Sequence, residues 1–354
     1  MRATRDFPRA WERADELGSD VASEFWRRFG PYGLGPDFPH HELVVERLMG
    51  EKRFVAAIKL LALYSRRFDG SNAEVVVNVL KWFLSGADQD PDQAALDSYD
   101  LTSLFGYLNA RADRSLRSEI AQLEWAYLPA LGFEPELGAI QEALSENPSF
   151  FVQLLEVVYY PKGEKAEEDT GSKAADDSGL DAQEESASRT MLAENAYRLL
   201  GAFDRLPGRN EDEIVDGDVL KWWVFKVLEL GQGLNRRGPA EIHVGQVLAT
   251  APSDADGTWP CKPVRDLLEL LQNSNVESGL QTAVLNRRGA TTRAVDEGGV
   301  QEKELVEKYR RMAERVADGS PRTAVILRSL ATSYEADARR EERSAERFRR
   351  GLER

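Results

Sequence analysis

The sequence contains very little cysteine and histidine. Its 354 residues include one cysteine, Cys261, and three histidines, His40, His41 and His243. A single cysteine excludes a disulfide framework, and so few cysteines and histidines exclude most metal sites and Cys–His catalytic pairs. His40 and His41 are adjacent, and neighbouring side chains on a helix point about 100° apart, which disfavours shared coordination of one ion. We therefore predict no metal site and no cofactor.

Positive charge and long apolar runs are also scarce. Lysine and arginine number 46 against 61 acidic residues, which gives a formal net charge of −15. A broad nucleic-acid footprint needs an excess of basic residues, so the composition disfavours one. No stretch approaches the roughly 18 apolar residues of a membrane-spanning helix, and the first residues lack the apolar core of a signal peptide. We expect a cytoplasmic protein whose thiol stays reduced.

Sequence motifs for common catalytic sites are missing as well. There is no GxxxxGK[ST] phosphate loop, no GxGxxG opening a helix and no GxSxG elbow. Glu124 stands beside two aromatic residues, which can raise a carboxyl pKa as in a general acid, but no second catalytic group is spaced to work with it. Asp254 and Asp256 begin a calcium-type loop, yet Arg265 stands where its closing glutamate belongs. We predict that the chain is not an enzyme.

Apolar residues recur at helical spacing along most of the chain. Phe54, Ile58, Leu61 and Ala62 lie at i, i+4, i+7 and i+8, which is one face of a helix. Further short stripes follow up to about residue 158, separated by polar breaks, and no strand pattern competes with them. This succession is typical of stacked helical hairpins. We predict an all-α fold in which residues 1–160 form a helical-hairpin, α-solenoid-like array.

An acidic linker separates this array from a second helical part. Residues 161–187 contain no aromatic residue and one large aliphatic residue, Leu180. Such a segment buries too little apolar area to offset its chain entropy, so we predict a disordered linker. Residues 188–354 are predicted to form a helical bundle that ends in two long helices, the last of them charged. Residues 219–230 are apolar nearly all round, so we expect them to form the most buried helix.

Aromatic, arginine and acidic residues cluster near predicted loops and helix ends, where they are candidate partner contacts. Tryptophan and arginine contribute strongly to binding energy at protein interfaces. The candidates are Trp26, Arg27, Arg28, Trp259, Arg287, Arg288, Arg293, Asp296 and Glu297.

The sequence LNRRG occurs twice, at Leu234–Gly238 and at Leu285–Gly289. Each copy has the pattern of a helix C-terminus, with cations at the negative end of the helix dipole and a left-handed glycine. A duplicated unit and a pair of arginine clamps for an anionic ligand are the alternatives.

Five stretches of the sequence are similar to one class of bacterial proteins. They are residues 123–129, 251–260, 285–289, 296–299 and 321–323. These stretches resemble the non-catalytic helical C-terminal region of large bacterial NTPase-type sensor proteins, including phage-defence proteins. In those proteins an ATPase or effector lies upstream, and the helical region recognises a trigger or a partner. The resemblance implies a protein partner such as an NTPase or effector, and it assigns no functional residue.

Three functions are compatible with these observations. The one we predict is a non-catalytic protein-interaction or sensing module of a bacterial cytoplasmic system, with another protein as its partner and no membrane contact. The alternative is a nucleic-acid-binding, winged-helix-like protein that uses the C-terminal arginine clusters. The third is a divalent-metal hydrolase built from Asp254, Asp256, Asp296 and Glu297.

Overall fold

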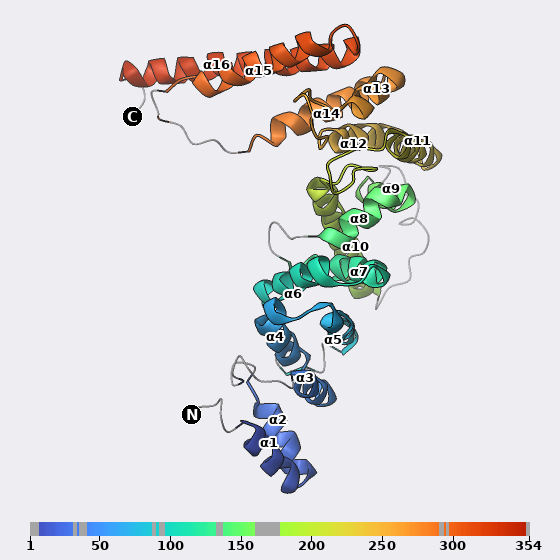
Figure 1. The fold of residues 1–354 in the computed structure, drawn as a ribbon, viewed down its shortest axis with the longest axis vertical. Coiled ribbons are helices and arrows are strands. Elements are labelled where there is room, and N and C mark those ends of the chain that lie inside the picture. Colours follow the sequence, from blue (N-terminus) through green and yellow to red (C-terminus); the bar gives the residue numbers. More distant parts are fainter. Residues whose placement is uncertain are drawn as a thin grey trace. The chain divides into compact units, whose positions relative to one another are not determined.

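The computed structural model describes residues 7–30, 34, 41–86, 90–91, 96–131, 137–159, 178–289, 294 and 297–351. Over these residues the protein has sixteen α-helices, short 3₁₀ turns and no β-strand, so the predicted all-α class is confirmed (Figure 1). No helix in this part of the chain is both long and apolar enough to cross a bilayer. The chain divides into two compact units, Met1–Ala143 and Leu144–Arg354.

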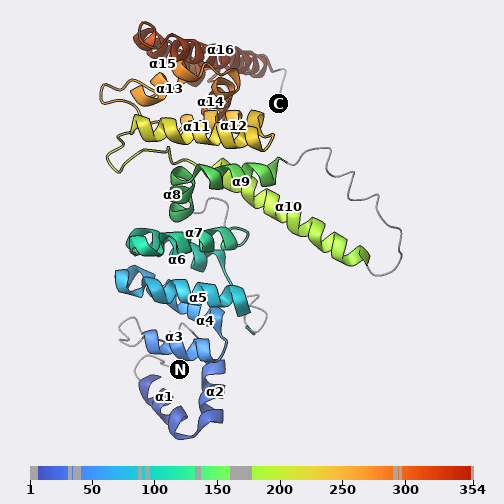
Figure 2. The same cartoon turned by 90° about the vertical axis from the view of Figure 1, so that its right-hand side faces the viewer.

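Short helices that pack on their near neighbours in sequence make up the first unit. They are α1 (Phe7–Glu16), α2 (Ser19–Arg28), α3 (His41–Gly50), α4 (Phe54–Tyr64), α5 (Ala73–Gly86), α6 (Ser98–Arg111), α7 (Arg117–Tyr127) and α8 (Gly138–Glu146), which runs into the second unit. Figure 2 shows α4 and α5 lying between α3 on one side and α6 and α7 on the other, in the manner of stacked hairpins. Helix α4 is the centre of this unit, because every residue except Lys59 and Leu63 is buried.

Two charged side chains of the first unit cap the ends of helices that are remote from them in sequence. At the start of α4, the buried carboxylate of Asp90 accepts a hydrogen bond of 2.7 Å from the backbone N–H of Val55. At the end of α2, the buried guanidinium of Arg53 donates to the carbonyl oxygens of Trp26 and Phe29 at 2.8 and 2.6 Å. Backbone groups at helix ends lack partners within the helix, so these contacts fix where neighbouring helices begin and end.

The second unit contains the remaining helices. They are α9 (Pro148–Val158), α10 (Ser178–Ala202), α11 (Gly217–Gly233), α12 (Arg237–Leu248), α13 (Lys262–Leu271), α14 (Ser274–Asn286), α15 (Val300–Val316) and α16 (Pro321–Arg349). Helix α9 packs on α10 and α11, so it lies with the second unit, whereas the predicted array extended to residue 160. Of the predicted linker, residues 161–177 lie outside the described residues, and residues 178–187 form the first turns of α10.

Helix α11 is amphipathic rather than buried all round, so the prediction that it is the most buried helix is wrong. Trp223 and Val224 are fully buried, but Trp222 is 55% exposed and Phe225 is 44% exposed. An apolar sequence does not fix which side of a helix is covered, and the helices that pack on α11 leave this face open to solvent. Helix α11 is capped at its start, since the carboxylate of Asp216 accepts from the backbone N–H groups of Asp218 and Val219.

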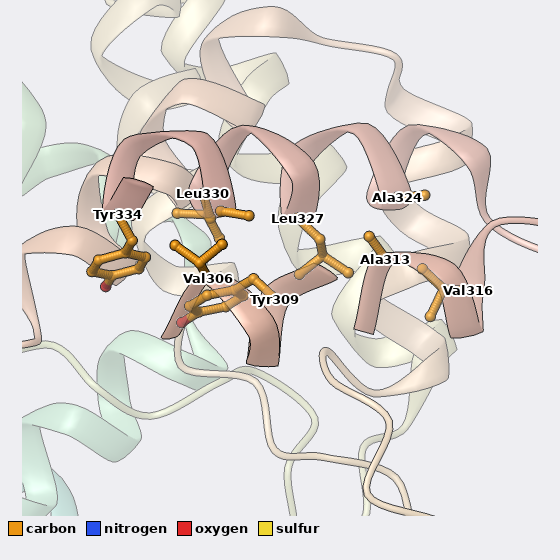
Figure 3. Close-up of a cluster of buried hydrophobic side chains, with 9 residues drawn as sticks. Val306, Tyr309, Ala313, Val316, Ala324, Leu327, Leu330 and Tyr334 are labelled. Carbon is orange, nitrogen blue, oxygen red and sulfur yellow. The ribbon is translucent and has the colours of Figure 1, made fainter. Parts of the chain in front are cut away.

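The two predicted long C-terminal helices are present as the hairpin of α15 and α16 (Figure 3). Its core is a cluster of buried residues that alternate between the two helices: Val306, Tyr309, Ala313, Val316, Ala324, Leu327, Leu330, Ala331 and Tyr334. The start of α16 is tied to α13, because the carboxylate of Glu269 accepts hydrogen bonds from the backbone N–H groups of Arg322 and Thr323. This hairpin and the end of α14 form the cavity described below.

Helices α12 and α14 cross at two glycines, one on each helix. A Cβ atom added to Gly245 would lie 2.0 Å from the carbonyl oxygen of Val276, and one added to Gly279 would lie 2.1 Å from that of Ile242. Only residues without a side chain allow two backbones to approach so closely. The crossing fixes the position of the C-terminal end of α14, where Arg287 and Arg288 follow.

Candidate functional site

A cavity of about 340 Å³ lies in the second unit, between the loop that follows α12, the end of α14 and the α15–α16 hairpin. Trp259 lines it from the loop, Arg287 and Arg288 from the end of α14, and Lys308 from α15. Three of the residues singled out in the sequence therefore meet here, although they come from two separate parts of the second unit. Lys308 was not among the predicted residues.

Stacked aromatic rings line part of this cavity. The rings of Tyr309 and Tyr334 are stacked, with centroids 5.6 Å apart and an angle of 7° between their planes (Figure 3). The indole of Trp259 meets Tyr309 edge to face at 6.4 Å, and its Nε1 donates a hydrogen bond of 2.9 Å to the carbonyl oxygen of Ala251. Burial raises the pKa of Tyr309 to about 12 and also raises the pKa of Tyr334. Both phenols are therefore neutral near pH 7.

The loop that carries Trp259 is held by its own acidic residues. The carboxylate of Asp254 accepts from the backbone N–H of Lys262 at 2.9 Å and forms an ion pair with Arg265 at 2.7 Å. The carboxylate of Asp256 accepts from the backbone N–H of Thr258. These carboxylates organise the turn, and within the described residues no group of three histidine, cysteine or acidic side chains is placed to hold a metal.

Arg288 is held by a buried carboxylate. Its guanidinium forms an ion pair with Glu302, whose side chain is 1% exposed, and lies 5.7 Å from the ring centroid of Tyr334. A buried carboxylate requires such a partner, because an unpaired charge in the interior is costly. Arg288 therefore joins α14 to the α15–α16 hairpin, and its charge is balanced inside the protein.

Two further cations at the cavity lack such a carboxylate partner. Within the part of the chain that the structure describes, the side chains of Arg287 and Lys308 have no hydrogen bond or ion pair, although both are solvent-accessible. Desolvation lowers the pKa of Arg287, an effect that the more distant carboxylate of Asp204 opposes. Arginine nevertheless keeps its charge at any physiological pH. Lys308 Nζ lies 5.6 Å from the ring centroid of Tyr309. The cavity thus presents net positive charge to solvent in a chain of net charge −15.

The N-terminal candidates have a different setting. Trp26 is 2% exposed and contacts Trp11 and Phe25 edge to face, each with ring centroids 5.2 Å away, so it is a core residue of the first unit. Arg27 and Arg28 are exposed on α2 and both pair with Glu24. The structure thus assigns Trp26 to packing and leaves only the two arginines at the surface.

The last three candidates, Arg293, Asp296 and Glu297, precede α15 in the sequence. Glu297 accepts hydrogen bonds from the backbone N–H of Ala294 at 3.1 Å and from Gln301 Nε2 at 2.9 Å. It therefore organises the entry to α15. Arg293 and Asp296 lie outside the described residues.

The two LNRRG copies have different structures. In the second copy Gly289 has the left-handed conformation, with φ of 64°, as predicted for a helix C-terminus. In the first copy the left-handed residue is Asn235, and Arg237 already begins α12. Arg236 there donates to the carbonyl oxygens of Leu234 and Asn235. The same residues therefore occupy different places relative to their helices in the two copies.

Glu124 and Cys261 are both buried in the protein interior. Glu124 is fully buried and accepts from the side chain of Asn109 at 2.7 Å and from the backbone N–H of Ile140 at 2.6 Å, near the start of α8. Burial raises the pKa of Glu124 against these hydrogen bonds, which lower it. Burial also raises the pKa of the Cys261 thiol, so the thiol stays protonated near pH 7.

Sequence reasoning missed Lys308, Tyr309 and Tyr334. The two tyrosines are buried and line the cavity, but their positions within apolar helical stripes gave no signal beyond packing. Comparison with protein families, curated proteins and solved structures gave no match to this chain.

Proposed function

We propose that the chain is a non-catalytic interaction or sensing module of a bacterial cytoplasmic system and that it binds an anionic ligand in the cavity at the end of α14. The observation that carries this proposal is the pair of cations, Arg287 and Lys308, that lack a carboxylate partner beside an apolar and aromatic wall. Arginine and lysine side chains that are not already paired with a carboxylate bind anionic groups through charge-assisted hydrogen bonds. Arg288 supports the site by holding the end of α14 against the hairpin.

The nucleic-acid alternative is less well supported by the arginines elsewhere in the second unit. Arg237 pairs with Glu241, Arg339 with Glu335 and Arg350 with Glu346, each four residues away on the same helix. Arginines balanced in this way give no extended positive surface, whereas a duplex footprint needs many unbalanced cations along one face. Arg287 and Lys308 instead line one cavity, which suits a single anionic group.

A sensing role also agrees with the helical-hairpin architecture. Hairpins that pack on their near neighbours form a scaffold that presents surfaces to a partner, and the partner we propose is another protein, such as an NTPase or effector. The exposed Trp222 and Phe225 on α11 are aromatic residues of the kind that anchor such contacts. Ligand binding at the cavity would then be the signal, and the partner would be the output.

Thermal unfolding of the full chain tests anion binding with a defined probe, inorganic pyrophosphate. Stabilisation by a ligand follows its concentration relative to its Kd. We expect pyrophosphate to raise Tm by a few degrees relative to sodium chloride at equal ionic strength. The double variant Arg287→Gln/Lys308→Gln should lose this shift. The matched control Lys303→Gln/Arg310→Gln removes two paired cations of α15 and should keep it.

Two results would contradict the proposal. One is an equal Tm shift in the wild-type protein and in the Arg287→Gln/Lys308→Gln variant, which would place the bound anion elsewhere. The other is the absence of any shift in the wild-type protein, which would mean that the two cations do not form an anion site.

A further inference from the structure

We infer that the ligand of this cavity is a nucleoside phosphate, in which the phosphate meets Arg287 and Lys308 and the base lies against Trp259. The inference rests on the proposed function and adds the chemical class of the ligand. It follows from three properties of the cavity: its charge, its size and the chemistry of its remaining walls.

The charge of the site matches one phosphate group. A phosphate monoester carries about −1.5 to −2 at pH 7. Arg287 and Lys308 supply two positive charges that the described residues do not balance by an ion pair, whereas Arg288 is already paired with Glu302. Arginine binds phosphate oxygens in a planar, bidentate manner, and lysine binds them as a point charge, so the two side chains can share one phosphate.

The size of the cavity exceeds what a phosphate fills. Its volume of about 340 Å³ lies within the range of roughly 300–1,000 Å³ that is typical of small-molecule sites. One water molecule takes about 30 Å³ of liquid volume, and a phosphate has only five heavy atoms. A phosphate alone would leave most of the cavity to water, so the ligand needs a second, larger part.

The remaining walls suit a flat aromatic group. Trp259, Leu305 and Met312 line the cavity and are only half-buried, so they have apolar surface left to cover. The hydrogen bond from Trp259 Nε1 to Ala251 fixes the indole before any ligand arrives. Stacking of a base on an aromatic side chain contributes about 1–3 kcal/mol by alanine substitution and tolerates any base. The methionine thioether adapts to the shape of its neighbour.

The same chemistry occurs in a free nucleotide and in a nucleotide unit of a single strand. The cavity lining supplies three cations, of which Arg288 is already paired with Glu302. A single strand needs a longer positively charged groove to follow its backbone, and the net charge of −15 opposes the binding of such a polyanion. These two observations favour the free nucleotide.

Isothermal titration calorimetry on the full chain tests the inference with four probes: adenosine monophosphate, ribose 5-phosphate, adenosine and a 5′-phosphorylated ten-nucleotide single strand. We expect adenosine monophosphate to bind at least tenfold more tightly than ribose 5-phosphate and than adenosine. Arg287→Gln should weaken both phosphates at least fivefold and leave adenosine unchanged. Trp259→Leu should remove the advantage of the nucleotide over the sugar phosphate, and Trp82→Leu, at an exposed tryptophan of α5, should have no effect.

A second measurement needs no variant, which matters because Trp259 also packs on Tyr309. In saturation-transfer NMR on the wild-type protein, the base protons of adenosine monophosphate should receive more saturation than the ribose protons. Equal affinity for ribose 5-phosphate and adenosine monophosphate would overturn the inference, while the anion site itself would stand on the pyrophosphate result. Tighter, steeply salt-dependent binding of the single strand would overturn the choice of a free nucleotide, and no binding of any probe would overturn the nucleotide class.

Discussion

The crossing of α12 and α14 makes a strong prediction about Gly245. In Gly245→Ala the new Cβ would start 2.0 Å from the carbonyl oxygen of Val276 and 2.7 Å from the amide nitrogen of Leu280, whereas ordinary contacts begin at 3.4 Å. Both blocking atoms belong to the backbone of α14, so no side chain can rotate away. The two helices must separate locally by about 1.4 Å, which opens the packing along their whole crossing.

The expected net effect of Gly245→Ala is a loss of about 2 kcal/mol of stability in the second unit. Overpacking a tight site costs typically 1–3 kcal/mol and sometimes more, and here the backbone contact places the cost near the upper end. Alanine regains about 1 kcal/mol through its better helix propensity. Gly201→Ala is the matched control, because Gly201 lies within helix α10 of the same unit with open space around its Cα. The control should be neutral or slightly stabilising.

Hydrogen exchange measured by mass spectrometry reports the stability of each helix separately, which suits a chain with two units. Peptides from α12 and α14 should exchange faster in Gly245→Ala than in the wild-type protein or in Gly201→Ala, while peptides from α4 should be unchanged. Unaltered protection of α12 and α14 in Gly245→Ala would refute the argument that the glycine is required by backbone contact.

Three further predictions concern buried polar groups. Glu302→Gln leaves Arg288 without its carboxylate and should cost about 2–3 kcal/mol in denaturant unfolding, whereas the apolar pair Glu302→Leu/Arg288→Met should cost less. Burial lowers the pKa of His243 to about 4, so the unfolded chain binds the proton more tightly than the folded chain does. The free energy of unfolding should therefore fall by about 2 kcal/mol from pH 7 to pH 5. His243→Gln should make the free energy of unfolding depend less on pH over this range. Glu124→Ala should cost about 1–3 kcal/mol by leaving the N–H of Ile140 unpaired, and Glu124→Gln, which keeps one of the two accepting oxygens, should cost less.

The fold class could be predicted from the sequence because it depends on local periodicity. The stripe beginning at Phe54 became α4, and the two long helices predicted at the end of the chain became α15 and α16. Burial was harder to predict, since it depends on which neighbours arrive from elsewhere in the chain. Trp222 and Trp223 are adjacent in one apolar run, yet the first is half exposed and the second fully buried. Local pattern gives the helix, and tertiary packing decides its faces.

The cavity depends on the same kind of distant neighbour, and the two LNRRG copies show why. In the first copy, Arg237 finds Glu241 four residues later on its own helix, so its charge is balanced by local sequence. In the second copy, α14 has already ended, and Arg288 finds Glu302 on another helix while Arg287 has no such carboxylate. The same five residues thus give an arginine that is paired within its own helix in the first copy and, among the described residues, an arginine without an ion pair in the second. Arg287 is exposed to solvent, which hydrates its charge in the absence of a ligand. Its position at a cavity with apolar walls supports the proposed ligand site, and the motif alone could not predict that position.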